Sequence, residues 1–104
     1  MIIKGNPRGG KAQVNTAGYI NIYEPEHPNA AGNGWVLEHR KVMSDHLGRA
    51  LLSNESVHHL NGDRTDNRLE NLELWSSAQP PGQRIEDKVK WAKEILALYE
   101  PKSN

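Results

Sequence analysis

Alternation of apolar and polar residues marks the first regular element of the chain. Residues 19–23 read Tyr-Ile-Asn-Ile-Tyr, the period-two pattern of a half-buried strand, and two prolines close behind it prevent its extension. From about Val36 the apolar positions recur at helical spacing, and Gly48 provides a stop. The pattern therefore predicts a strand followed by a helix over about 36–47.

The second half of the chain predicts a hairpin and a further helix. Residues 55–59 lead into the turn sequence Asn61-Gly62-Asp63, and residues 72–75 can return as the partner strand. After the break Pro80-Pro81-Gly82, the spacing predicts a helix over about 85–99. Its apolar residues form one stripe, through which we expect the helix to pack: Ile85, Val89, Ala92, Leu96 and Tyr99.

Composition limits the chain to one small domain. A chain of 104 residues buries only roughly 60–65% of its unfolded surface. No cysteine is present, which excludes disulfides and thiolate zinc sites and makes any bound metal more consistent with catalysis than with structure. We expect the core to combine aliphatic residues with the larger aromatic ones: Trp35, Trp75, Trp91, Tyr19, Tyr23 and Tyr99.

Charge and hydropathy limit the mode of DNA binding and the cellular location that we expect. The formal net charge of zero argues against a protein held tightly on DNA by many phosphate contacts. Residues 1–17 nevertheless contain Lys4, Arg8 and Lys11, no acidic residue and several glycines, so we expect a flexible basic arm that either contacts DNA or is simply disordered. Without a long apolar segment or a signal peptide, the protein is expected to be cytoplasmic and to avoid membranes.

Two adjacent histidines at the end of the predicted hairpin strand carry the candidate chemistry. His58 and His59 are followed by the Asn-Gly-Asp turn, then by Asn67, and then by Asn71 within Glu-Asn-Leu. Hydrolysis of a phosphodiester needs a base that takes a proton from water, a ligand for a divalent cation, and a neutral amide that holds the base in place. This short segment supplies a group of each kind.

The order and spacing of these residues resemble the HNH endonucleases, most closely the small forms found in phage genomes and among free-standing homing enzymes. The resemblance extends from about Gly18 to about Tyr99 and is densest between Glu38 and Arg84. It implies an α+β fold with a single domain over 18–104. In that domain a ββα-metal core at about 50–84 follows an N-terminal β-strand region and a helix, and a C-terminal helix completes it.

The resemblance also assigns roles. His59 matches the general base, and His58 matches the first metal-binding position. Asn71 matches the central asparagine, which fixes the loop and orients the base. The third signature position, usually histidine, falls here on Gln79 or Pro80, and the amide oxygen of Gln79 is the candidate second ligand for Mg²⁺ or Mn²⁺, with Ni²⁺ or Zn²⁺ as alternatives. Adjacent strand residues face apart, so the two histidines are expected to meet through a bend at the strand end.

Each assignment has a plainer alternative. His59 could be a partly buried histidine bonded to backbone, Asn71 an ordinary turn residue, and Gln79 a surface residue. Arginines near the motif are candidate phosphate contacts or charge stabilisers, and each could equally form a surface salt bridge. They are Arg40, Arg49, Arg64 and Arg84.

The sequence therefore predicts a divalent-metal-dependent endodeoxyribonuclease whose partner is DNA. One such site cuts one strand per visit, so nicking is the expected product, and double-strand cleavage requires a dimer or two events. Two alternatives remain open. One is a catalytically degenerate nucleic-acid-binding module with the same fold, and the other is an accessory subunit that acts with phage packaging proteins.

Overall fold

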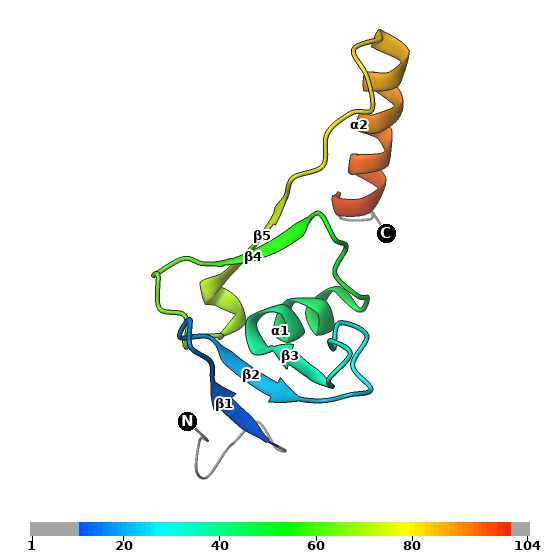
Figure 1. Ribbon diagram of the computed structural model, residues 1–104. Coiled ribbons are helices and arrows are strands. Elements are labelled where there is room, and N and C mark those ends of the chain that lie inside the picture. Colours follow the sequence, from blue (N-terminus) through cyan, green and yellow to red (C-terminus); the bar gives the residue numbers. More distant parts are fainter. Residues whose placement is uncertain (1–10, 101–104) are drawn as a thin grey trace.

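Two small antiparallel sheets and two α-helices make up the part of the chain that the computed structural model describes, residues 11–100 (Figure 1). The class is α+β, as predicted. One sheet has the strand order β1 (Ala12–Val14), β2 (Ile20–Tyr23) and β3 (Trp35–Leu37), and the other is the hairpin of β4 (Glu55–His59) and β5 (Leu72–Ser76). The α-helices are α1 (Glu38–Leu47) and α2 (Ile85–Tyr99), and a 3₁₀ turn, η1 (Leu69–Asn71), precedes β5.

The first predicted strand is confirmed as β2, whereas the helix after it begins two residues later than predicted. Val36 and Leu37 belong to β3, where Val36 pairs with Ile22. The apolar residues of β3 also fit the helical period, so the pattern could not separate the strand from the helix. α1 ends as predicted at Gly48, whose φ of 72° lets its backbone N–H bond the carbonyls of the last turn.

The predicted boundary of the N-terminal arm at residue 17 is wrong. Strand β1 lies inside the predicted arm, pairs along its length with β2, and places Ala12 in the core at 1% exposure. Lys11, immediately before it, is exposed. Lys4 and Arg8 lie outside the described residues.

Helix α1 joins the two sheets. It contacts β2 and β3 of the first sheet and both strands of the hairpin. The buried residues form two clusters, Ala12, Ile20, Ile22 and Val36 in the first sheet, and Met43, Leu51, Val57 and Leu72 between α1 and the hairpin. This packing holds the first turn of α1 beside β4, where the two histidines lie.

The aromatic residues do not form the core, contrary to the prediction. None of the six is buried, and Trp75 and Tyr23 are 52% and 40% exposed. The two buried clusters consist of aliphatic side chains and Met43, and the six aromatic side chains, each of which carries an N–H or O–H, stay partly or fully exposed.

Helix α2 has the predicted bounds, but most of its predicted stripe is not packed. Figure 1 shows α2 standing apart from the sheets, after an extended segment that follows β5. Trp91, Ile95 and Tyr99 turn toward that segment and line a pocket with Asn54. Much of the predicted stripe stays exposed: Ile85 at 76%, Val89 at 48% and Leu96 at 54%. The helix has two apolar faces, and periodicity alone does not show which of them packs. None of the described helices is long and apolar enough to cross a membrane.

A buried carboxylate ties α2 to the hairpin. The Glu55 side chain accepts two hydrogen bonds from Arg49, at 2.8 and 2.9 Å, and one from the Tyr99 hydroxyl at 2.8 Å. The backbone N–H of Leu52 donates a further one at 2.7 Å. The bonds from Arg49 make the largest contribution to lowering the pKa of Glu55, which falls to about 2. Arg49 is therefore committed to this structural pair.

Candidate active site

One cleft, of about 560 Å³, brings the two histidines together with residues distant in the sequence. It lies between β4 and the start of α1. The polar and aromatic side chains that border it include Tyr19, His39, Arg40, His58, His59 and Arg64. They come from the loop before β2, from α1, from β4 and from the loop after β4.

The two histidines reach this cleft from opposite faces of β4. The pairing of β4 with β5 stays regular up to His59 opposite Leu72, so the predicted bend is not observed. His59 shares the α1-facing side with buried Val57. On the other side the ring of His58 stacks on Trp75, with the ring centroids 3.7 Å apart.

The ring of His59 is held by two buried polar residues. Its Nε2 lies 2.6 Å from the Oδ1 of Asn67, and the Nδ2 of Asn67 donates to the Oε1 of Glu38 at 2.8 Å. Asn67 and Glu38 are 8% and 5% exposed. Sequence reasoning did not assign a role to either, because they come from separate elements. For Glu38 the available signal was a carboxylate directly after the apolar residues 35–37, whereas Asn67, between Asp66 and Arg68, gives no comparable signal.

A third imidazole lies beside the pair and was also missed. The ring of His39 stacks on Tyr19, with centroids 5.0 Å apart, and its centroid is 5.1 Å from that of His59. Its Nδ1 is buried without a hydrogen-bond partner. Burial, followed by the nearby His59, lowers the pKa of His39 to about 4. His39 is therefore neutral at pH 7 and adds no charge beside His59.

Asn71 fixes the loop that follows the histidines. Its Oδ1 accepts from the backbone N–H of Asn61 at 3.1 Å, and its Nδ2 donates to the Asn61 Oδ1 at 3.0 Å and to the Asp66 carbonyl at 2.8 Å. The side chain thus bridges both ends of the turn. This geometry is the one that the predicted loop-fixing role requires, and the turn-capping alternative describes the same contacts.

Replacing Asn71 by alanine is expected to lower the free energy of unfolding by roughly 1–3 kcal/mol, because the change leaves the bonding groups of Asn61 and Asp66 without partners. Urea unfolding followed by circular dichroism measures this. Gln83→Ala, at an exposed position, is the control and should unfold like the wild type. Equal midpoints for Asn71→Ala and Gln83→Ala would show that the loop does not depend on this side chain.

The structure does not bring Gln79 to His58, and the predicted ligand pair is not assembled. Ser76 lies opposite Glu55, and the N–H of Ser77 bonds the carbonyl of residue 54, so the chain leaves the hairpin at the end away from His59. At about 3.3 Å per residue along each strand, Gln79 is on the order of 20 Å from His58. It is exposed beside α2. Spacing alone suggested proximity because it does not reveal the direction in which the chain leaves β5.

The side chains at the cleft do not form a complete set of metal ligands on their own. Within residues 11–100, no group of three or more His, Cys, Asp or Glu side chains is placed to hold an ion. His58 is the predicted ligand that borders the cleft, with its Nε2 already 3.2 Å from the hydroxyl of Ser56.

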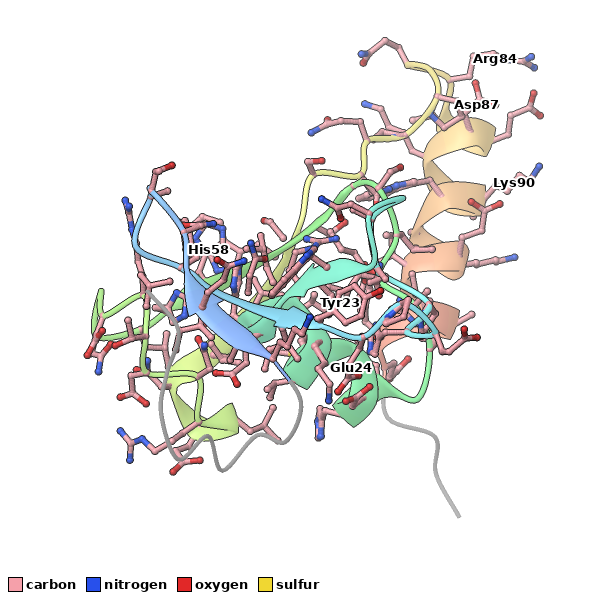
Figure 2. The ribbon with its side chains drawn as sticks, turned by 60° about the horizontal axis from the view of Figure 1, so that its bottom comes forward. Tyr23, Glu24, His58, Arg84, Asp87 and Lys90 are labelled. Atoms are coloured by element: carbon pink, nitrogen blue, oxygen red, sulfur yellow. The ribbon has the colours of Figure 1, made fainter. Side chains whose placement is uncertain are left out.

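Two of the predicted DNA contacts border the cleft and one does not. Arg40 lies on the α1 side, and the guanidinium of Arg64 lies over the ring of Tyr19 at 4.9 Å. Arg84 pairs with Glu86 at the start of α2. Figure 2 shows Arg84 at the far end of the molecule from His58.

The site therefore combines a hairpin packed against α1, two consecutive histidines, a loop fixed by an asparagine, and flanking arginines. Residues 36–79, less than half of the chain, match the family model described as HNH endonuclease, and this match supports the predicted resemblance to that family. The predicted resemblance and the ββα-type core are thereby confirmed. No curated protein and no solved structure matched the chain in the corresponding comparisons.

The match to this family model has general consequences for activity and partners. An HNH endonuclease domain indicates nuclease activity and implies binding to nucleic acid. HNH nucleases generally use divalent metal ions.

Proposed function

We propose that this protein is an endonuclease that hydrolyses phosphodiester bonds in DNA, with His59 as the general base. The observation that carries the proposal is the position of His59. Its ring borders an open cleft, one ring nitrogen is engaged by Asn67, and the other is left to accept a proton.

The reaction follows from the groups at the cleft. His59 takes a proton from a water molecule as its oxygen attacks phosphorus, and the bond from phosphorus to the 3′ oxygen breaks. The 3′ oxygen takes up a proton from solvent water as it leaves, so the products are a 5′-phosphate and a 3′-hydroxyl. Arg40 and Arg64 lie at the cleft where they can bind the non-bridging oxygens, whose charge grows in the transition state.

A divalent ion would stabilise the leaving oxygen, as metal ions do in phosphoryl chemistry. His58 is the side chain at the cleft that would hold the ion, together with water and the DNA phosphate. Because one site handles one strand, we propose nicking as the primary activity.

The absence of Gln79 from the cleft favours a second candidate, a module that binds nucleic acid without cutting it. A duplex labelled at one 5′ end distinguishes the two. With Mg²⁺ or Mn²⁺ present, a nuclease releases shorter strands with 3′-hydroxyl ends on a denaturing gel. A binding module shifts the duplex in a native gel and leaves both strands intact.

Chelation is expected to separate activity from folding. EDTA should abolish strand cleavage, while the melting temperature changes by less than about 2 °C, because the described residues contain no metal cluster that could support the fold. Gel assays and thermal unfolding on the same sample measure the two effects. Unfolding of the protein on chelation would show that the metal is structural.

A further inference from the structure

The hydrogen bonds around His59 also determine the orientation of the Asn67 amide. Asn67 touches two partners through the two ends of its amide, Glu38 through Nδ2 and His59 through Oδ1. A carboxylate accepts hydrogen bonds and cannot donate them, so the NH₂ end of Asn67 must face Glu38. The amide orientation therefore follows from the chemistry of its partner and places Oδ1 against the ring of His59.

That orientation decides which nitrogen of His59 carries the proton. An amide oxygen only accepts, so the Nε2 at 2.6 Å must be the protonated nitrogen of neutral His59. The lone pair is then confined to Nδ1. A free histidine side chain exchanges between two tautomers, and the wrong one would offer no lone pair at Nδ1.

We infer that Glu38 and Asn67 are positioning residues that lock His59 in the Nε2–H tautomer, with Nδ1 as the proton-accepting atom. This inference rests on the proposed function for its consequence in catalysis, whereas the tautomer itself does not depend on cleavage. When Nδ1 takes the proton from water, the ring becomes a cation whose Nε2–H still donates to Asn67. The bond then becomes charge-assisted and stronger.

The burial of Glu38 and Asn67 supports this inference. Glu38 and Asn67 are 5% and 8% exposed, so water does not compete well for their hydrogen bonds. Glu38 begins α1, and Asn67 lies in the segment between the two hairpin strands, 29 residues further along the chain. We call the hydrogen-bonded series Glu38, Asn67 and His59 the relay. The relay therefore also links the orientation of the His59 ring to the packing of α1 against the hairpin.

Nitrogen-15 NMR of the imidazole groups at a pH where His59 is neutral reads the tautomer directly. The wild-type protein is expected to show a single Nε2–H form. Asn67→Ala removes the acceptor, and His59 should relax to the mixture of forms that a free histidine shows. If that variant does not fold, Glu38→Gln tests the same point. A glutamine has the same shape as glutamate but can also donate, so the amide of Asn67 can take either orientation. His59 should then again show a mixture of tautomers.

Asn67→Asp is the matched control. It keeps the shape and an acceptor oxygen facing His59, so the single Nε2–H form should be retained even though a second carboxylate beside Glu38 costs stability. Cleavage by folded Glu38→Gln should fall roughly ten- to a hundredfold in kcat with KM little changed, the size of effect typical for residues that orient a functional histidine.

The outcomes separate this inference from the proposed function. A wild-type protein that shows the Nε2–H form and does not cleave DNA retains the relay and overturns the nuclease. A wild-type protein with a mixed or Nδ1–H form overturns the relay, whatever its activity. An unchanged single form in a folded Asn67→Ala or Glu38→Gln variant overturns it as well.

Discussion

Replacing His59 by alanine is expected to slow DNA cleavage by roughly 10²–10⁴-fold, the contribution of a positioned general base. The substitution removes an imidazole that borders the cleft and whose Nε2 is hydrogen-bonded to the buried Asn67. Single-turnover cleavage of a labelled duplex measures the rate of the chemical step. DNA affinity should change little, since a base acts mainly in the transition state.

Two comparisons keep this result interpretable. His46→Ala changes an exposed histidine at the other end of α1 and should leave the rate unaltered. Circular dichroism should show that the His59→Ala protein is folded. A folded His59→Ala protein that cleaves at the wild-type rate would remove His59 from the mechanism.

The second large effect concerns stability in acid and depends on Glu55. Its pKa is about 2 in the folded protein against an ordinary value of 4.5, so the folded state favours the charged form. The stabilisation is complete above pH 4.5 and is lost as the pH falls toward 2. The difference between the two pKa values corresponds to roughly 3 kcal/mol of unfolding free energy.

Glu55→Gln should therefore lose roughly 3 kcal/mol near neutral pH, because Arg49 and Tyr99 are left without their charged partner. The difference between wild type and variant should shrink as the pH falls from 4.5 toward 2. Urea unfolding at a series of pH values measures this, with Glu94→Gln, at an exposed carboxylate, as the control. A difference that stays constant with pH would mean that the charge of Glu55 does not support the fold.

Periodicity predicted those elements whose pattern is unambiguous and local. β2 alternates cleanly, the β4–β5 hairpin surrounds a strong turn sequence, and α2 is bounded by a proline-rich break. β1 and β3 were missed because each has only three residues, too few to establish a period. The packing of α2 could not be predicted because its two apolar faces compete and only the folded chain shows which one is used.

The residues of the candidate site also divide into those that a local motif predicts and those that only the fold brings to the site. His58, His59 and Asn71 lie within one short motif, and the structure places the histidines at one cleft, with Asn71 fixing the adjacent loop. Glu38 and His39 reach the site only because α1 packs on the hairpin. No local sequence pattern predicts this packing, because it joins segments that are distant along the chain. The prediction for Gln79 failed for the related reason that distance along a sequence does not specify the direction of the chain.

Supercoiled plasmid incubated with the purified protein and Mg²⁺ or Mn²⁺ tests the central claim most directly. A single break in either strand converts the plasmid to the open circle, so even slow cleavage is detected on an agarose gel. The proposed function predicts that open circles accumulate with wild-type protein and that EDTA prevents their formation. Plasmid that is bound by the protein yet remains supercoiled under these conditions would contradict the nuclease and leave a nucleic-acid-binding module.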